Sequence, residues 1–438
     1  MGELMDEEQQ SAAETATIEL PESLHVNNLQ ELGPEELDAL CRDFEVRAFP
    51  GRTRHQQILD LVRNALTRGI RVTTEGWLDP VAEHLGVLRW PAINFLPVPE
   101  DVGVTRDMIK EFHLEAAQWI SGTVRLPRER EKILMLDQLT AIEGMPPNEW
   151  SERKKFDDLT PLYPEGRIML ENAKRESISA RAVDLLAPLG RGQRGLIVAP
   201  PRVGKTILLK EIAKSIRLNH PEIVLIILLV DERPEEVTDL EREVDCQIYS
   251  STFDQSPQRH VQVADVVLER AKRLVELNKD VVILLDSITR LSRGYNALQG
   301  KGRTMSGGVD SKSLMKPKKF FGSARNVEEG GSLTILATAL VDTGSKMDQV
   351  IFEEFKGTGN MELHLDRALV EKRLYPAIHV LQSGTRREDL LYHPDEWQAV
   401  QNLRKVMAAL PPIEAMEKLI ENLQSTKSNA ELLLAGLR

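Results

Sequence analysis

A lysine and a threonine follow a tight glycine turn in the middle of the chain, an arrangement typical of a phosphate-binding loop. The apolar run Leu196–Ala199 leads into Pro-Pro-Arg-Val-Gly-Lys-Thr at residues 200–206, and a helical pattern begins directly afterwards. Backbone N–H groups of such a loop and the positive end of the helix face an anion. Lys205 would reach terminal phosphates, and the Thr206 hydroxyl would bind Mg²⁺. Ala199 stands where the usual pattern has glycine.

Two carboxylates stand at the ends of later apolar runs, where they could serve phosphate chemistry. Val281–Leu285 ends in Asp286, a position from which a carboxylate reaches the Mg²⁺ shell in phosphate-loop enzymes. Ile223–Val230 runs into an Asp and then Glu232, which could polarise an attacking water. Either acid alone could instead cap the next helix. In chain order after the loop, they indicate an ATPase.

Two arginine-containing turns add possible nucleotide contacts. Gly-Arg-Gly-Gln-Arg-Gly at residues 190–195 precedes the first strand, and Arg191 or Arg194 could approach nucleotide, although a charged hairpin is the plainer interpretation. Ser-Gly-Thr at residues 383–385 places Arg386 after a flexible turn. A planar guanidinium suits developing phosphoryl charge, so Arg386 could serve a neighbour's site, or form only a surface salt bridge.

Length and composition bound the class of protein. A chain of 438 residues predicts two or three domains, and 41% hydrophobic and 28% charged residues are typical of soluble globular proteins. No apolar run reaches the roughly 18 residues of a membrane span, and no secretory signal pattern is present. Cys41 and Cys246 have neither metal nor redox spacing. We therefore expect a cytoplasmic protein with no membrane partner. The net charge of −12 restricts any polyanion to a local basic patch.

The N-terminal part reads as an acidic tail followed by helices. Residues 1–24 predict a disordered, solvated tail. Residues 25–70 predict a small helical subdomain, with Pro34 in a first turn and Thr53 with Gln56 as a capping box. The positions expected to face inward are Leu37, Leu40, Cys41, Phe44, Ile58, Leu61, Val62 and Ala65.

The rest of the chain predicts a small barrel, a linker and a large α/β domain. Residues 71–145 carry short runs punctuated by Gly and Pro, which favour a β-barrel, and residues 146–159 read as a charged linker. Residues 160–438 alternate strands and helices, which indicates a parallel sheet buried on both faces, with two or three helices from 395 to 437. The expected barrel strands are 86–89, 94–98, 119–126 and 133–142; those of the large domain are 196–199, 223–230, 281–285 and 333–340, with helices at 207–218 and 259–277.

From about Asp157 to Arg387 the chain resembles the Rho family of bacterial transcription termination factors, hexameric RNA-dependent ATPases with a RecA-like core. Residues 25–70 resemble the family's N-terminal helical subdomain, and the family itself shows the departure at Ala199. The resemblance implies an OB/cold-shock-like RNA-binding fold at residues 71–145 and a RecA-like P-loop domain after it. The matching runs are Gly190–Pro201, Asp231–Val237, Leu285–Arg290, Asn326–Gly331 and Glu353–Leu363.

The resemblance also implies roles for individual residues in the ATP site. It assigns Lys205 to the phosphates, Thr206 and Asp286 to Mg²⁺, and Glu232 as the catalytic carboxylate. The residues it places around ATP are Gly190, Arg191, Gly192, Gln193, Arg194, Gly195, Arg202, Val203, Gly204, Lys205, Thr206, Ile207 and Arg233.

Three further arginines match functional positions of the family. Arg290 matches its arginine valve and Arg386 its arginine finger, while Arg373 matches a second arginine that acts on a neighbouring subunit.

Two loops would contact RNA in the pore of a ring. The glycine-rich segment 298–308 matches the family's pore loop, with Arg303 in place of the more usual lysine and one residue fewer. Residues 343–347 match the second pore element, in which Lys346 would face backbone phosphates. Without the resemblance, a flexible lid and a solvated lysine explain the same residues.

The barrel departs most from the family, which stacks pyrimidines on aromatic rings there. Leu85 and Val87 occupy positions where Phe is usual, and Gly103 replaces an expected Tyr. Arg89 remains as an RNA-binding candidate. Substitute platforms could come from Trp90 and Phe95.

The sequence therefore predicts a Rho-type terminator, a homohexamer that uses ATP and Mg²⁺ to pull along single-stranded RNA from 5′ to 3′ and dismantle the RNA polymerase elongation complex. One alternative is a DNA recombinase or rotary-motor subunit on the same core, against which the barrel and glycine-rich loop speak. A second is a non-enzymatic RNA- or polymerase-binding regulator, which gains from the missing aromatics but not from the complete catalytic set.

Overall fold

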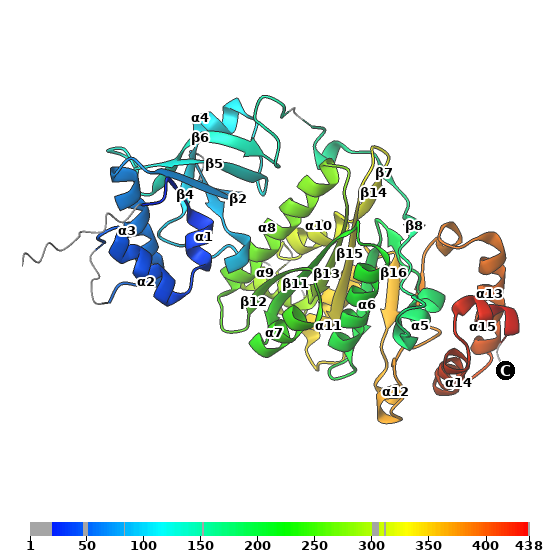
Figure 1. Cartoon of the computed structure of the whole chain (residues 1–438). Coiled ribbons are helices and arrows are strands. Elements are labelled where there is room, and N and C mark those ends of the chain that lie inside the picture. Colours follow the sequence, from blue (N-terminus) through cyan, green and yellow to red (C-terminus); the bar gives the residue numbers. More distant parts are fainter. Residues whose placement is uncertain are drawn as a thin grey trace, which may run out of the picture. The chain divides into compact units, whose positions relative to one another are not determined.

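The computed structural model describes two compact units (Figure 1). The described residues are 20–46, 51–82, 84–150, 153–299, 306–310 and 312–436. The first unit takes in the described residues up to Trp90 together with 96–115 and 119–150, and the second takes in 91–95, 116–118 and the described residues from 153 onward. Most of the acidic tail predicted at 1–24 lies outside the described residues.

The helical signals at the start of the first unit are confirmed. Pro34 is the first residue of α2, and Thr53 caps α3 because its hydroxyl accepts from the Gln56 N–H at 3.3 Å while the Gln56 side chain accepts from the Thr53 N–H at 3.0 Å. The expected inward positions are buried, except that Leu40 is only partly so. The helices are α1 (Val26–Glu31), α2 (Pro34–Asp43) and α3 (Arg54–Thr67).

The predicted barrel is present and closed. The strands run in the order β1-β2-β3-β4-β6-β5, and an additional antiparallel pairing of β2 with β5 closes the sheet. The apolar faces of α2 and α3 share one core with the barrel, so helices and barrel fold as one unit. The strands are β1 (Ser23–His25), β2 (Arg71–Ala82), β3 (Leu85–Arg89), β4 (Val102–Thr105), β5 (Trp119–Arg125) and β6 (Leu134–Ile142), and the short helix α4 (Arg106–Glu111) follows β4.

One predicted barrel strand is wrong. Residues 94–98 form a loop after the short 3-10 helix Pro91–Ile93, because Asn94 and Phe95 adopt φ of +52° and +62°, which no strand allows. Three strands of this sheet escaped the sequence pattern, and the first of them, β1, lies across the predicted boundary between the tail and the helical subdomain. Gly76 and Pro80 interrupt the alternation of β2, and the four residues of β4 are too few to show a period.

The second unit contains the predicted parallel sheet. Strands β12-β11-β13-β15-β10-β16 run parallel in that order, and β17 pairs antiparallel with β16 at the edge. The strands that position the site are β10 (Arg194–Ala199), β11 (Val224–Glu232), β12 (Gln247–Thr252), β13 (Asp280–Asp286), β15 (Ser332–Leu340), β16 (Met361–His364) and β17 (Gly384–Thr385). Short strands β7 (Pro161–Leu162) and β14 (Arg325–Val327) extend it, and β8 (Glu165–Arg167) pairs with β9 (Gly190–Arg191).

Helices cover both faces of this sheet (Figure 1), as the near-continuous apolar runs of its strands require. Alternate strand residues, such as Leu225 and Ile227, share a core with α5, α6 and α7. Helices α8, α9 and α11 contact the strands from outside this core. The helices are α5 (Ile178–Leu186), α6 (Lys205–Asn219), α7 (Pro234–Glu243), α8 (Pro257–Glu276), α9 (Ile288–Leu298), α10 (Met315–Gly322), α11 (Lys346–Lys356) and α12 (Arg367–Glu371).

Three helices close the described chain, as predicted: α13 (Pro394–Ala408), α14 (Pro412–Ser425) and α15 (Asn429–Ala435). Helices α14 and α15 are tied to α5 through Arg181, whose guanidinium donates to the carbonyls of Leu423 and Thr426, both at 2.6 Å, and to the Asn429 side chain at 3.0 Å. Across the described residues, no helix is both long and apolar enough to cross a membrane.

Candidate nucleotide site and RNA-contacting elements

The phosphate loop lies between the carboxyl end of β10 and the first turn of α6. Arg202 and Gly204 both adopt left-handed φ, +66° and +87°, and nothing within 4 Å would meet a Cβ at Gly204, so the glycine is required by its backbone angle. Lys205 is the first residue of α6, and its Nζ donates to Asp286 Oδ1. The structure therefore brings together the lysine and the carboxylate predicted from sequence.

Asp286 ends β13 and is only 1% exposed. Besides Lys205, its Oδ1 accepts from the Thr338 hydroxyl of β15 at 2.7 Å. Thr338 was not predicted from sequence, although a hydroxyl inside an apolar strand signals a buried hydrogen bond. These contacts hold the carboxylate at the end of the sheet where the phosphate loop begins.

Glu232 ends β11, the neighbour of β13, and is 4% exposed. Its Oε2 lies 2.8 Å from the guanidinium of Arg290, in the first turn of α9. Burial, the largest cause, and the charge of Asp286 raise the pKa of Glu232 to about 7, against the opposing charges of Lys205 and Arg290. A carboxyl group with a pKa near neutrality can accept a proton from water at working pH.

The remaining loop residues surround the start of α6. The Thr206 hydroxyl donates to Glu236 of α7 at 3.3 Å. Ile207 and Arg233 are exposed, whereas Val203 is buried and offers only its backbone to a ligand. The hydroxyl of Thr206 and the carboxylate of Asp286 are oxygen donors, the set that Mg²⁺ prefers, so the residues present fit that ion.

The structure does not bring the glycine-rich segment 190–195 to the phosphate loop. The segment ends in the first two residues of β10, Arg194 and Gly195, while the loop follows the last residue of β10, and the six residues of this parallel strand span about 17 Å. The guanidinium of Arg191 pairs with Asp280 and, at 3.0 Å, with Glu222. Gly192 has a φ of +88°, and a Cβ there would lie 2.2 Å from the backbone nitrogen of Asn326. Residues 190–195 therefore do not line the phosphate loop of their own chain, and their placement around ATP stays a prediction.

The two arginines predicted to act on a neighbour lie at opposite ends of the sheet. The Arg386 N–H donates to the carbonyl of Asn360, just before the amino end of β16, and its side chain is exposed. Arg373 is exposed in the hairpin between Leu365 and Ile378, which extends past the carboxyl end of β16 with α12 at its tip (Figure 1). Arg373 therefore lies at the same end of the sheet as the phosphate loop, and Arg386 lies at the opposite end.

The loop at residues 343–347, which is predicted to contact RNA, is held in place by a hydrogen bond to Asp348. The Asp348 carboxylate is 1% exposed, accepts from the Arg293 guanidinium at 2.9 and 2.6 Å and from the Thr343 hydroxyl at 2.6 Å. Lys346 is exposed at the first turn of α11, and within the described residues it forms no ion pair. Arg303, predicted in the glycine-rich loop, lies outside the described residues.

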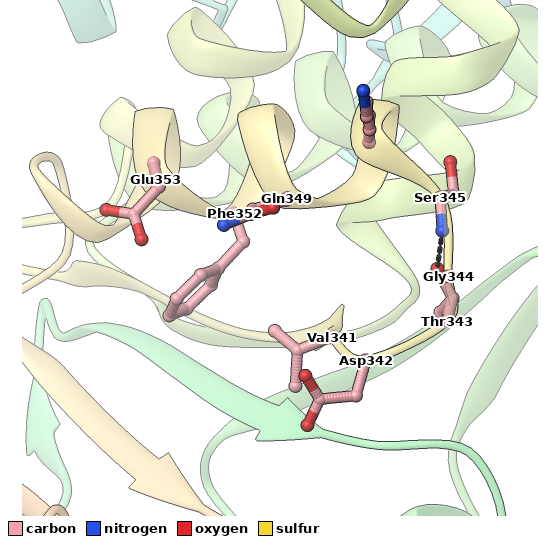
Figure 2. Close-up of a pocket in the computed structure, with 9 residues that line it drawn as sticks. Val341, Asp342, Thr343, Gly344, Ser345, Gln349, Phe352 and Glu353 are labelled. Carbon is pink, nitrogen blue, oxygen red and sulfur yellow. Dashed lines mark hydrogen bonds between the residues drawn. The ribbon is translucent and has the colours of Figure 1, made fainter.

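A cavity of about 380 Å³ adjoins this loop. Figure 2 shows Val341 and Asp342 on one side of it and Phe352 and Glu353 on the other, with the Ser345 N–H donating to Thr343. The cavity lies at the end of β15, the strand next to β10, so the loop stands beside the phosphate-binding edge.

The barrel shows what fills the space of the missing aromatics. Val87 pairs directly with Gly103 across β3 and β4. A Cβ at Gly103 would lie 2.6 Å from Met135 Sδ and 3.1 Å from Leu85 Cδ1, so aliphatic side chains occupy that place. The structure thus leaves no room for a ring at position 103 without movement of Met135.

Arg89 and the two substitute platforms have other partners. Arg89 is buried, with its guanidinium paired to Asp101 and, at 3.1 Å, to Asp79, so the structure gives no support to its prediction as a phosphate contact. Burial raises the pKa of Asp101 to about 6, against the opposing charge of Arg89. Phe95 is fully buried within the second unit against Tyr249, with ring centroids 5.0 Å apart. Of the two candidate platforms, only Trp90 is partly exposed, and the centroid of its ring lies 5.8 Å from that of Trp119.

Comparison with known proteins gives the family. Residues 74–148 match a family described as the Rho termination factor RNA-binding domain, and residues 179–385 match the ATP synthase alpha/beta family nucleotide-binding domain. The chain is 49% identical to the transcription termination factor Rho of Akkermansia muciniphila, over 95% of this chain and 88% of the relative. The chain belongs to the Rho family of transcription termination factors.

Other members of the family agree over the same extent. The Rho proteins of Aquifex aeolicus and Bacillus subtilis are 50% and 48% identical, over 91% and 93% of this chain and 93% and 94% of theirs. Among solved structures, a type III secretion system ATPase from pathogenic bacteria matches with a TM-score of 0.53 and 21% identity, over 64% of this chain and 86% of that one, which supports the fold. The predicted family and fold class are confirmed: an ATPase domain follows an RNA-binding barrel.

Proposed function

We propose that this Rho-family chain assembles into a homohexameric ring that hydrolyses ATP, pulls along single-stranded RNA from 5′ to 3′ and releases transcripts from the RNA polymerase elongation complex in the cytoplasm. The observation that carries the proposal is the position of Arg386. It lies beyond the amino ends of the parallel strands, whereas Lys205, Asp286 and Glu232 lie at the carboxyl ends. An arginine finger placed there serves only the site of another copy.

Head-to-tail contacts of this kind close into a ring when the rotation between copies permits. In such a ring, the exposed guanidinium of Arg386 stabilises charge that develops on the neighbour's phosphates. Arg373, exposed in the hairpin beyond the carboxyl end of β16, is the second arginine that acts on a neighbouring subunit.

Within one subunit, each polar group has a separate task. Lys205 exchanges its contact with Asp286 for the terminal phosphates of ATP, and the N–H groups of the loop hold the other phosphate oxygens. Thr206 and Asp286 would hold Mg²⁺ directly or through its waters, and the ion would supply positive charge against the phosphates. Glu232 positions the attacking water and takes up its proton, while Arg290 holds the carboxylate in place.

RNA contacts couple to this site through the loop at the end of β15. Lys346 contacts backbone phosphates in the pore, together with Arg303 of the glycine-rich loop. Because β15 pairs with both β13 and β10, movement of its terminal loop reaches the strands that carry Asp286 and the phosphate loop. A rotary-motor subunit shares the nucleotide-binding fold, but the Rho-type RNA-binding match at residues 74–148 favours the RNA-driven ring.

Mixing of two inactive variants tests the proposal. Arg386→Ala chains keep an intact phosphate loop, and Lys205→Ala chains keep an intact finger. Mixed rings contain interfaces that join the two intact halves, so RNA-stimulated ATP hydrolysis should recover to a fraction of the unmodified rate. Full ATPase activity of Arg386→Ala on its own, or of monomers separated by dilution, would contradict the action of Arg386 on a neighbour.

A further inference from the structure

The polar groups of the glycine-rich segment 190–195 do not face the phosphate loop of their own subunit. Those of Gln193 and Arg194 form hydrogen bonds with Asn360 instead. The side chain of Gln193 is fully buried, and its Nε2 donates to the carbonyl of Asn360 at 3.2 Å and to Asn360 Oδ1 at 2.6 Å. The Arg194 N–H donates to the same Oδ1 at 2.8 Å. Gln193 and Arg194, two successive residues of the segment, therefore both donate hydrogen bonds to Asn360.

Asn360 in turn holds Arg386. The carbonyl of Asn360 accepts from the Arg386 N–H at 2.8 Å, so one oxygen is shared by Gln193 and Arg386. The Asn360 N–H donates back to the carbonyl of Arg194 at 2.9 Å. The chain of contacts runs from Gln193 to Asn360 and then to the backbone of the arginine finger.

Further hydrogen bonds hold Arg194 in place, and the side chain of Arg386 is exposed. Arg194 fixes the preceding turn because its side chain donates to the carbonyls of Thr358 at 3.1 Å and Ala324 at 3.0 Å. Arg386 lines a cavity of about 890 Å³ together with Arg194, Asn360 and Tyr163. Among the described residues, the side chain of Arg386 forms no ion pair, although the nearby carboxylate of Glu362 interacts with its charge. The hydrogen bond from its backbone N–H to Asn360 therefore fixes the point from which the side chain extends.

We propose that Gln193, acting through Asn360, is a positioning residue for Arg386 and so serves the ATP site of the neighbouring subunit rather than its own. The proposal rests on the action of Arg386 on a neighbour described above. The glycine-rich segment does not line the phosphate loop of its own subunit, and the proposal gives it a role at the neighbouring site instead. A finger displaced by about 1 Å can lower the rate of chemistry by about a hundredfold.

Gln193→Leu tests the proposal because it keeps the volume of the side chain and removes the amide. We expect kcat to fall tenfold to a hundredfold with ATP binding and the KM for ATP little changed. Added to Arg386→Ala, Gln193→Leu should cause no further loss, since the finger is already gone. Gln401→Leu, on the exposed surface of α13, makes the same chemical change away from the contact and should leave activity unaltered.

Complementation separates a positioning role from a general structural one. Gln193→Leu chains mixed with Lys205→Ala chains should recover activity, because one supplies the phosphate loop and the other the finger. Mixed with Arg386→Ala chains they should not, because neither supplies a finger. Recovery with Arg386→Ala, or no recovery with Lys205→Ala while Arg386→Ala itself complements, would overturn the proposal.

Substitutions of Asn360 provide the matched pair. Asn360→Asp keeps the acceptor for Gln193 and Arg194 and should retain most activity, whereas Asn360→Leu should behave as Gln193→Leu does. If Arg386→Ala is fully active, the proposed function itself fails. If Arg386→Ala is inactive and Gln193→Leu and Asn360→Leu are both fully active, only the present inference fails.

Discussion

The guanidinium of Arg290 lies 2.8 Å from the carboxylate of Glu232, so the first turn of α9 supplies a counter-charge to the acid at the end of β11. This counter-charge does not keep the pKa of Glu232 at the ordinary value of a glutamate. Burial and the charge of Asp286 outweigh the two nearby cations and raise its pKa to about 7. Activity that needs the ionised carboxylate should therefore rise with pH through neutrality.

Arg290→Ala removes a charge that lowers the pKa of Glu232, so that pKa should move further upward. The rising limb of kcat/KM for ATP should then shift to higher pH, with the largest loss near pH 7 and a smaller loss in alkaline buffer. The measurement is the pH profile of RNA-stimulated hydrolysis for both proteins. An unchanged limb would show that Arg290 does not set the charge of Glu232.

Glu232→Gln should bind ATP normally and fail to turn it over, because the amide keeps the shape of the side chain and cannot take up a proton. The expected loss in kcat is at least about a hundredfold, the lower end of what general base catalysis contributes. Fluorescent nucleotide binding and hydrolysis are measured side by side. Hydrolysis near the unmodified rate would remove Glu232 from the catalytic role.

Lys205→Ala should abolish hydrolysis while leaving the fold intact. The substitution removes the cation that faces the phosphates, and Asp286 keeps its hydrogen bond from Thr338. Circular dichroism and thermal unfolding check the fold, and Lys405→Ala on the exposed face of α13 is the matched control. Substantial turnover by Lys205→Ala would contradict the assignment of the phosphate loop.

The barrel should bind RNA with little preference for cytosine. Leu85, Val87 and Gly103 replace three expected rings, and stacking contributes about 1–3 kcal/mol per base. Phosphate contacts, which are insensitive to sequence, should dominate the remaining affinity. Salt titrations of fluorescent oligo(C) and oligo(A) on the full chain without ATP should give nearly parallel curves. Tight, C-selective binding would show that Trp90 or another ring has taken over.

Aromatic rings at positions 85, 87 and 103 need space that the side chain of Met135 now occupies beside Gly103. Leu85→Phe, Val87→Phe and Gly103→Tyr together should strengthen oligo(C) binding only when Met135→Ala removes the side chain that now occupies the place of the third ring. Without Met135→Ala, the triple variant should lose stability, by about 1–3 kcal/mol as for other overpacked cores. Thermal unfolding separates the two outcomes, and stable, C-selective binding by the triple variant alone would contradict the crowding at Gly103.

Lys346→Ala should weaken RNA activation of hydrolysis without changing basal ATP binding. Loss of one phosphate contact reduces the salt slope of RNA binding by about 1. The RNA concentration for half-maximal ATPase stimulation should rise, and Lys405→Ala should leave it unchanged. An unaltered RNA requirement would place the RNA contact elsewhere.

Local sequence predicted most of the residues that meet at the candidate nucleotide site and much of the fold. Gly204 and Lys205 at the junction of a strand and a helix, and carboxylates at the ends of the two apolar runs, follow from short-range rules on backbone angles and strand ends. The parallel sheet followed from continuous apolar strands, and the helical subdomain from the capping box at Thr53. Where the period was short or broken, as in β2 and β4, sequence alone missed the strand.

The tertiary structure decided which end of the sheet each residue occupies, and this depends on strand order and direction rather than on local pattern. Gln193 and Lys205 are 12 positions apart in the chain, yet β10 separates them, while Gln193 and Asn360 meet across 167 positions. In the sequence, Arg89 is a basic residue that could bind RNA, whereas in the folded chain its guanidinium pairs with Asp79 and Asp101. Long-range pairing of this kind is set by how the whole chain packs, so no window of sequence contains it.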